Sequence, residues 1–418
     1  MARVTLLSGT DRGHTYPVVG VALALRRRGH EVLVVTGRRR GPELDAAGVP
    51  WAPIPDAEPH DEGRDLSGTL WSWAAAAARP TAALLRAAGT DVVVSDVLMA
   101  AGGLAADVAG LPWIQLVPHH LADAAVELPP MGLGRHPSRL PWVRADDRLI
   151  HRRAERSRAE GRRDREVARA HLGLPGTGRP VLRLVASLPG LEYPRRRWPA
   201  DAHLVGPLAW DPPEVGVGAA DGADLLSWLD PDGPPVVVAT DSTGTGARGG
   251  LAAVTVEALR GLDVQLVAIT APPRRSGAAE VSGGPTPWPL RCVVGHVPHH
   301  RALDRAAVTV APGGAGVVGK SLRRGVPMVL APDFGDQIEA AARVSWAGAG
   351  RRVRSARGLP PGALRRAVVR VLADDRYAQA AGRLAAEAAA LGPDRAAALV
   401  EAVLAGTTPV ATGPTRAA

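Results

Sequence analysis

The chain has 418 residues, of which 46% are hydrophobic, and a formal net charge of +9. This length exceeds one ordinary domain and suits two domains of roughly 200 residues, each able to bury its own apolar core. The single cysteine, Cys292, excludes an internal disulfide and fits a reducing compartment. The first residues lack the features of a signal peptide and no stretch is apolar enough to cross a membrane, so a cytoplasmic protein is expected.

The positive charge comes almost wholly from arginine, because Lys320 is the only lysine. Arginines are densest between Arg144 and Arg169, where acidic residues interrupt them. Such a stretch can form a solvated helix, associate weakly with an anionic membrane surface or a lipid-like acceptor, or bind nucleic acid. A solvated helix is the favoured interpretation and membrane association is the alternative. The lack of base-stacking aromatics argues against nucleic acid.

The first half of the chain alternates apolar runs with helical patterns, which predicts a doubly wound α/β domain over residues 1–210. The loops of such a domain lie at the carboxyl ends of parallel strands. Strands are predicted at 3–8, 31–36, 91–95, 111–117, 181–186 and 204–207, and helices at 17–28, 71–88, 102–109 and through the arginine-rich stretch. Loops are predicted at 9–14, 38–40, 50–59 and 118–141, and the length of the last is typical of a functional loop.

The second half of the chain begins with residues 211–234, which have the composition of a linker and a short helix at 225–229. The α/β pattern then restarts, so a second domain is expected at 235–390. Its predicted elements are strands at 236–240, 264–270 and 307–311 and helices at 249–259, 363–372 and 376–391. Residues 391–418 would form a last helix at 394–404 and a frayed tail from 407.

The stretch from Pro312 to Gln337, PGGAGVVGKSLRRGVPMVLAPDFGDQ, has the pattern of a glycine-rich turn, a short helix and a strand. Its glycines let backbone amides approach an anion at the positive end of the helix. Residues 314–321 also satisfy the Walker A pattern of P-loop nucleotide hydrolases. However, the helix has room for only about two turns, whereas a P-loop helix crosses the sheet. A P-loop hydrolase therefore stays a minor alternative.

The same stretch resembles the donor site of GT-B glycosyltransferases of the UDP-glycosyltransferase-like family, whose signature is HGGAGT, a short helix, RRGVP and PxxxDQ. Residues 312–317, 323–327, 332 and 336–337 carry this match, and regions 1–36, 191–210 and 296–298 are similar to the family in the same order. Residues 119–137 resemble its actinobacterial branch, which acts on polyketide, antibiotic or glycolipid acceptors. The resemblance implies two Rossmann-like domains that face each other across a cleft, with the last helix crossing back to the first domain.

The resemblance also implies a catalytic pair. His14, in the family's GHxxP loop, would take the proton of the acceptor hydroxyl, and Asp96 would orient the base and stabilise its imidazolium form. Gly13, His119 and His120 would lie on the acceptor side. The two loop histidines equally suit hydrogen-bonded loop residues, and both interpretations stay open.

On the donor side, Pro312 replaces a histidine of the family and Val317 replaces a threonine or serine, so two polar phosphate ligands are absent. Lys320 either supplies the missing charge or is a solvated surface lysine. His296 and Val297 would contact a nucleobase, which could be uracil or thymine. The complete expected donor set is Ser242, Thr243, His296, Val297, Gly313, Gly314, Ala315, Gly316, Val317, Lys320, Asp336 and Gln337.

These features predict an inverting, metal-independent glycosyltransferase that moves a hexose or deoxyhexose from a UDP- or TDP-sugar to a lipophilic small molecule, such as a polyketide or antibiotic aglycone. Neither a cofactor nor a nucleic-acid partner is expected, and the chain would act as a monomer or homodimer. The two missing phosphate ligands favour one alternative, a catalytically impaired auxiliary partner of an active glycosyltransferase.

Overall fold

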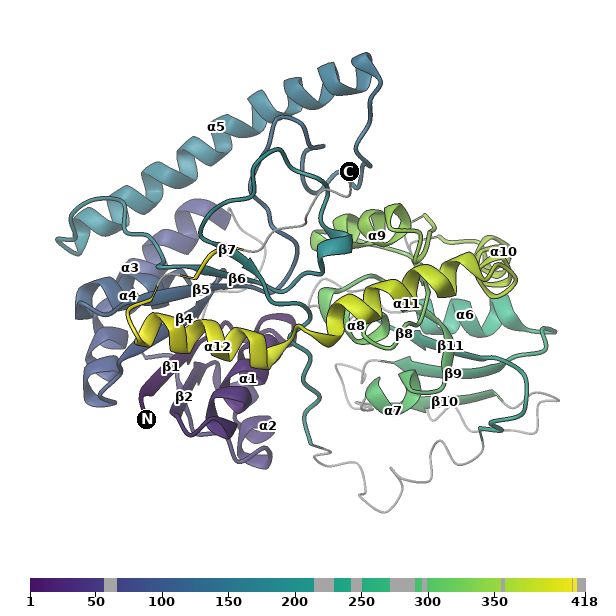
Figure 1. Cartoon of the computed structure of the whole chain (residues 1–418), viewed down its shortest axis with the longest axis horizontal. Helices are drawn as coiled ribbons and strands as arrows, with labels where there is room; N and C mark the ends of the chain where they lie inside the picture. Colours follow the sequence, from purple (N-terminus) through teal and green to yellow (C-terminus); the bar gives the residue numbers. More distant parts are fainter. Residues whose placement is uncertain are drawn as a thin grey trace. The chain divides into compact units, whose positions relative to one another are not determined.

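A computed structural model describes residues 1–55, 66–213, 229–241, 250–270, 290–294, 299–354, 358–407 and 409–411. The chain divides into two compact units: unit 1 is Met1–Met131, Pro137–Trp210 and Ala390–Ala418, and unit 2 is Gly132–His136 and Asp211–Ala389. Each unit is built on a parallel sheet with helices against it, as the sequence predicts (Figure 1). Among the described helices, none is both long and apolar enough to span a membrane.

The sheet of unit 1 has the strand order β3-β2-β1-β4-β5-β6-β7, and its neighbouring strands are parallel. Its strands are β1 (Arg3–Leu7), β2 (Glu31–Thr36), β3 (Trp51–Pro53), β4 (Val92–Asp96), β5 (Trp113–Val117), β6 (Arg183–Val185) and β7 (Ala202–Leu204). The central strands β1 and β4 are mainly apolar, and nearly all of their residues are buried, as expected for strands covered on both faces. The strand order reverses between β1 and β4, and ligands bind at such a switch point.

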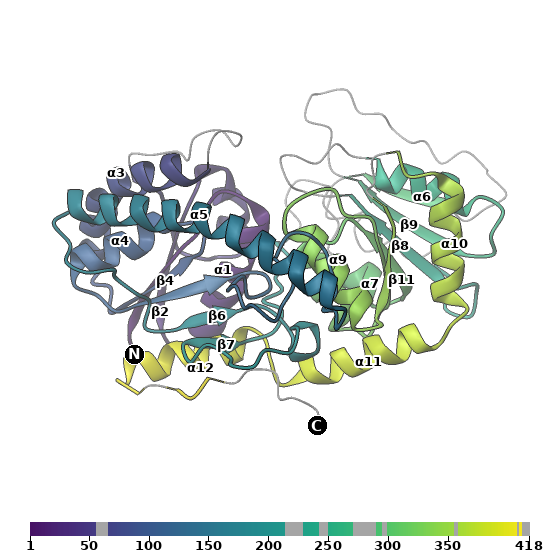
Figure 2. The ribbon, with the colours of Figure 1, turned by 90° about the horizontal axis from the view of Figure 1, so that it is seen from above.

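Helices cover both faces of this sheet. They are α1 (Arg12–Arg27), α2 (Gly41–Ala46), α3 (Leu66–Ala87), α4 (Ala100–Ala109), α5 (Pro141–His171) and α12 (Pro393–Leu404), with short 3-10 turns η1 (Arg38–Arg40) and η2 (Pro189–Leu191). Helices α1 and α12 pack together over one face, and α3 and α4 pack together over the other, with α5 against α3 (Figure 2). Each face thus has its own apolar core.

The last helix, α12, is held on α1 by a charged contact. Glu401 accepts hydrogen bonds of 2.9 and 2.7 Å from Arg28 and lies 3.1 Å from Nε2 of His30. The hydrogen bonds from Arg28 contribute most to a pKa of about 2 for Glu401, so its carboxylate is ionised at neutral pH. The chain therefore returns to unit 1 after unit 2 is complete.

The sheet of unit 2 has the order β10-β9-β8-β11-β12-β13, also with parallel neighbours. Its strands are β8 (Val236–Thr240), β9 (Gln265–Thr270), β10 (Leu290–Val294), β11 (Ala306–Ala311), β12 (Met328–Leu330) and β13 (Gly350–Arg352). Its helices are α6 (Leu251–Leu259), α7 (His299–Leu303), α8 (Ala315–Leu322), α9 (Asp336–Trp346), α10 (Pro361–Leu372) and α11 (Arg376–Ala389). The order reverses between β8 and β11, so the loop after β11 lies at a second switch point.

The arginine-rich helix α5 is stabilised by contacts within unit 1. Arg158 and Arg162 form exposed ion pairs with Glu155. Farther along, Arg169 is buried against Asp107, and the guanidinium of Arg165 lies 5.7 Å from the centre of the Trp71 ring. These contacts give α5 a structural role in unit 1, and weak association with a membrane surface stays a prediction.

Several element boundaries differ from the predicted ones. Helix α1 begins at Arg12 instead of Pro17, and Pro17 lies inside it, where the missing amide leaves the Gly13 carbonyl without its usual intrahelical donor. Parts of two predicted loops form η1 and the edge strand β3. Gly132–His136, predicted in the first domain, belongs to unit 2 because it packs against α9. Residues 56–59 and 225–228 and most of the predicted tail lie outside the described residues.

Candidate active site

His14 and Asp96 meet at the switch point of unit 1. Because β1 and β4 are parallel neighbours, the loop after β1 and the end of β4 lie at the same edge of the sheet. Nδ1 of His14 lies 2.9 and 3.0 Å from the two carboxylate oxygens of Asp96. The Asp96 side chain is fully buried, whereas that of His14 is 21% exposed. With Nδ1 donating to the carboxylate, the basic lone pair of the imidazole lies on Nε2.

Both members of this pair are held in place by their backbone surroundings. The Leu98 amide donates to Asp96 at 2.9 Å, which fixes the carboxylate. His14 lies in the first turn of α1 and not in the predicted loop. The hydroxyls of Thr15, in the same turn, and of Thr36, in β2, both donate to the Gly9 carbonyl, at 2.9 and 2.8 Å. The turn that carries the histidine is therefore connected to β2 through this shared acceptor. Such preorganisation is what a general base requires.

The loop histidines have structural partners. Nδ1 of His120, a buried residue, lies 3.0 Å from the Ser187 hydroxyl and 3.6 Å from Glu192, whose carboxylate also accepts the Leu121 amide. Nδ1 of His119 lies 2.8 Å from the His120 carbonyl. Both are thus hydrogen-bonded loop residues, and contact of either with an acceptor stays a prediction.

A cavity of about 400 Å³ in unit 1 reaches Asp96. Trp71, Met99 and Trp113 contribute apolar walls, and Arg165 and Arg179 lie among its polar lining residues. The volume lies in the range of small-molecule sites. Asp96 thus lines a space that is both aromatic and basic, although its carboxylate is fully buried and His14 is not among the lining residues.

In unit 2, the glycine-rich turn joins β11 to α8 at the second switch point. Gly313 has φ +103°, and a Cβ at this position would lie 3.2 Å from the Gln337 carbonyl oxygen. Gly316 is exposed, and the space around its Cα is open. The amides of Ala315, Gly316 and Val317 have no intrahelical acceptors because they begin α8. The turn therefore offers exposed donors at the positive end of a helix dipole, which suits an anion.

The two residues predicted to bind the sugar, Asp336 and Gln337, begin α9 and differ in burial. Gln337 is buried, and its side-chain oxygen accepts the Asp333 amide at 3.2 Å, so this residue holds its own loop together. Asp336 is half-exposed at the helix start. Because the Gln337 backbone adjoins Gly313, Asp336 lies beside the glycine-rich turn. Of the predicted pair, Asp336 is the partly exposed member and Gln337 the buried one.

Lys320 has a partner that the sequence did not reveal. Its ammonium forms an ion pair with Asp211, and the two side chains are only 7% and 12% exposed. His300 contributes Nδ1 at 3.2 Å from the same carboxylate. Burial alone would raise the pKa of Asp211, but the charge and hydrogen bond of Lys320 outweigh it and lower the pKa. Lys320 is thus neither a solvated lysine nor directed at a phosphate, because Asp211 holds its charge.

The remaining predicted donor residues, Ser242, Thr243, His296 and Val297, lie outside the described residues. Asp211 was missed because it lies in a stretch whose composition is that of a linker, and no motif distinguishes it there. Among the described residues, the predicted donor residues that are at least partly exposed are Gly314, Ala315, Gly316, Val317 and Asp336, and their role in donor binding stays a prediction.

The positive φ of Gly313 gives a stability prediction. Gly313→Ala should lower the free energy of unfolding of unit 2 by about 1–3 kcal/mol, because alanine at this φ is strained and its methyl group crowds the Gln337 carbonyl. Gly316→Ala is the matched control: its methyl group enters open space and alanine favours a helix, so stability should rise by about 0.5–1 kcal/mol. Calorimetric unfolding of both variants checks this, and equal shifts would contradict it.

Comparisons with known proteins agree with this architecture. Residues 254–402 match the family model described as "Erythromycin biosynthesis protein CIII-like, C-terminal domain". Over 93% of its length, the chain is 30% identical to 4'-demethylrebeccamycin synthase of Lentzea aerocolonigenes, covering 96% of that protein. Over 96% of its length, it is 28% identical to O-mycaminosyltylonolide 6-deoxyallosyltransferase of Streptomyces fradiae, covering 97% of that protein.

Solved structures with the same fold include the calicheamicin glycosyltransferase CalG4, with a TM-score of 0.70 and 23% identity over 98% of this chain and 100% of that one. They also include the Streptomyces glycosyltransferase SsfS6 complexed with thymidine diphosphate, with a TM-score of 0.66 and 21% identity over 96% of this chain and 99% of that one. At these identities the likeness concerns the fold.

Proposed function

The chain belongs to the GT-B glycosyltransferases of the UDP-glycosyltransferase-like family, in its actinobacterial natural-product branch, and from this premise we propose the reaction it catalyses. It transfers a hexose or deoxyhexose from a nucleoside diphosphate sugar to a hydroxyl group of a lipophilic small molecule, with inversion at the anomeric carbon. The His14–Asp96 pair carries this proposal, because it joins a partly exposed base to a buried, oriented carboxylate.

In the proposed step, the acceptor oxygen attacks the anomeric carbon and the bond from that carbon to the diphosphate oxygen breaks. The hydroxyl proton moves to Nε2 of His14, and the Asp96 carboxylate stabilises the resulting imidazolium. The electron pair of the broken bond stays on the diphosphate, whose developing charge meets the amides that begin α8. A single displacement of this kind inverts the anomeric centre. Neither a metal nor a cofactor takes part.

The donor and acceptor classes are supported by the relatives. One relative is named as a 6-deoxyallosyltransferase, and one solved neighbour was complexed with thymidine diphosphate, so we take a TDP-deoxyhexose as the first donor to test and a UDP-hexose as the second. The aromatic walls of the cavity at Asp96 suit the apolar rings of a polyketide or antibiotic aglycone. We place the enzyme in the cytoplasm, which the single cysteine supports.

An auxiliary, non-catalytic role is the second candidate, and one observation favours it. Pro312 and Val317 replace the polar phosphate ligands of the family, and the ion pair with Asp211 prevents Lys320 from compensating. The intact His14–Asp96 pair favours catalysis instead, since a binding partner would have no use for an oriented base.

The direct test is turnover by the purified chain. TDP-deoxyhexoses and UDP-hexoses would each be combined with a panel of hydroxylated aromatic and macrolide acceptors, and both the glycoside and the released diphosphate would be measured. Glycoside formation without added metal supports the transferase. Nucleotide binding with no glycoside from any pair would support the auxiliary role.

A further inference from the structure

The first half of α5 presents large apolar side chains to solvent. Trp142 and Leu149 are 68% and 45% exposed, and Leu140, just before the helix, is 47% exposed. Trp142 and Leu149 are two helical turns apart, so together with the exposed Ala145 they lie on one face of the helix. Exposed apolar side chains that are gathered on one face, unlike scattered ones, mark an interaction surface.

The opposite face of this half of α5 is held against unit 1. Asp147 is buried, and Nε2 of His151 lies 3.0 Å from the carbonyl oxygen of Leu128. By helical spacing, Asp147 and His151 lie on the side opposite Trp142 and Leu149. The second half of α5 packs on α3, whereas the first half extends past α3 (Figure 1). These contacts keep the apolar residues turned toward solvent.

Arginines accompany the apolar residues. The exposed arginines of residues 139–156 are Arg139, Arg148, Arg152, Arg153 and Arg156. The last three follow Leu149 by three, four and seven residues, so they continue its face of the helix. Within the described part of the chain, none of the five forms an ion pair with a carboxylate. The exposed acids of this stretch are Asp146 and Glu155, and Glu155 is already paired with Arg158 and Arg162.

We propose that this docking face, formed by Leu140, Trp142, Leu149 and the five arginines, binds the surface of an anionic lipid bilayer. A helix with arginines beside exposed apolar residues is the pattern that lies in the plane of a membrane surface. Tryptophan suits the boundary between acyl chains and headgroups, because its ring is apolar and its N–H remains able to bond there. The arginines would bury their stems and direct their guanidinium groups to the lipid phosphates.

Charge and shape argue against other occupants of the docking face. In a symmetric dimer, the same face of both copies would meet and bring like-charged arginines together. A nucleic acid would neutralise the arginines but leave Leu140 and Leu149 against a polar backbone. An outward-facing helix suits a yielding lipid surface, which offers apolar and anionic groups at the same time.

Docking would bring the enzyme to its acceptor. A lipophilic acceptor partitions into a bilayer, so an enzyme on the bilayer surface would meet it at a higher local concentration. This consequence rests on the proposed transferase activity. The docking itself is measured without donor or acceptor, so its failure would leave the proposed reaction untouched.

Co-sedimentation of the full chain with lipid vesicles tests the proposal. We expect binding to vesicles of equal parts phosphatidylglycerol and phosphatidylcholine at low salt, weaker binding as salt rises, and little binding to phosphatidylcholine alone. Arg152→Gln/Arg153→Gln should lower partitioning by roughly 10- to 30-fold, because each arginine near an anionic surface contributes about fivefold. Trp142→Ser should lower it by roughly 10-fold.

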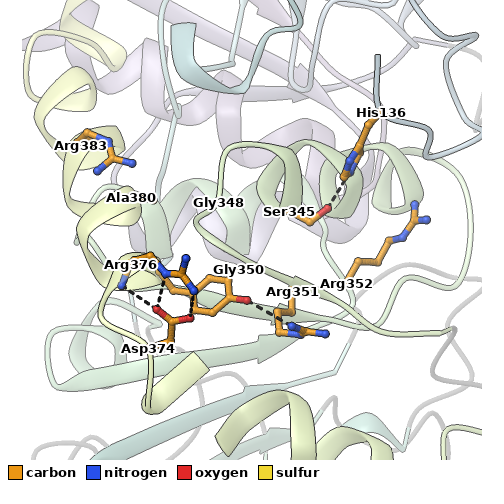
Figure 3. A pocket seen from close by; sticks show the side chains of 11 residues that line it. His136, Ser345, Gly348, Gly350, Arg351, Arg352, Asp374, Arg376, Ala380 and Arg383 are labelled. Atoms are coloured by element: carbon orange, nitrogen blue, oxygen red, sulfur yellow. Dashed lines mark hydrogen bonds and ion pairs between the residues drawn. The ribbon is translucent and has the colours of Figure 1, made fainter. Parts of the chain in front are cut away.

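A charge-matched control separates this face from the general positive charge of the chain. Arg366→Gln/Arg383→Gln removes the same charge from exposed positions on α10 and α11 of unit 2, where Figure 3 shows Arg383, and should bind as the parent does. Because the altered side chains are exposed, all these variants should fold normally, which thermal unfolding checks. Equal losses in this control and in Arg152→Gln/Arg153→Gln would overturn the proposal.

Fluorescence reports which side of the protein meets the lipid. The chain has ten tryptophans, so quenching by brominated lipids is compared between the parent and Trp142→Phe. The docking face predicts that most of the quenching is lost in this variant. Absence of binding to the anionic vesicles would overturn the proposal. Self-association of the chain that Trp142→Ser abolishes, without vesicle binding, would also overturn it and identify a second copy as the occupant.

Discussion

Replacing His14 with alanine should lower kcat by about 10²- to 10⁴-fold while leaving nucleotide affinity nearly unchanged. The loss follows from the geometry of the pair, since both carboxylate oxygens of Asp96 lie within hydrogen-bond distance of the imidazole Nδ1. Nucleotide affinity should persist because the glycine-rich turn belongs to unit 2. Steady-state kinetics with saturating donor, together with calorimetry of nucleotide binding, measure both quantities.

Two further variants make this result specific. Asp96→Asn keeps the shape of the buried side chain but removes the charge that stabilises the imidazolium, so we expect a smaller loss of roughly 10- to 100-fold. His171→Ala changes an exposed histidine at the end of α5 and should leave the rate unchanged. If His14→Ala and His171→Ala had the same rate, the pair would have no catalytic role.

The sheets and their covering helices could be predicted from the sequence, because a buried parallel strand is a short, mainly apolar segment. Val92–Asp96 and its neighbour in the sheet, Arg3–Leu7, are two such segments. Since loops after parallel strands share one edge, the meeting of His14 and Asp96 could be expected from the motif and the strand pattern together. The helix start at Arg12 could not, because Pro17 suggested a later one.

Neither a contact between distant parts of the chain nor the burial of a side chain leaves a local signal in the sequence. Asp211 lies 109 positions before Lys320 in a stretch with linker composition, so the pair emerges only in three dimensions. Gln337 was predicted to meet a sugar, yet it is buried and bound to its own loop. For both Lys320 and Gln337, burial determines whether the polar side chain is available to a ligand, and burial cannot be predicted from a sequence motif.

Replacing Lys320 with methionine should lower the free energy of unfolding of unit 2 by about 3–5 kcal/mol, because it leaves the largely buried Asp211 carboxylate without its cationic partner. The double variant Lys320→Met/Asp211→Leu removes both charges and should recover most of this loss. Calorimetric unfolding of the parent, Lys320→Met, Asp211→Leu and the double variant measures the coupling. A single variant as stable as the parent would show that the ion pair contributes nothing.

The same variant has a defined pH dependence. Lys320 lowers the pKa of Asp211 in the folded state, so this contribution is present above the ordinary value of 3.8 and is lost as pH falls through the folded pKa. The stability difference between parent and Lys320→Met should therefore be largest near neutral pH and shrink in acid.

Nucleotide affinity of the Lys320→Met variant separates the two roles of the lysine. If Lys320 binds phosphate, the variant should bind nucleotide roughly 10- to 150-fold more weakly and unfold with the same free energy as the parent. If Lys320 is instead held by Asp211, the variant should be less stable than the parent and its nucleotide affinity should change little.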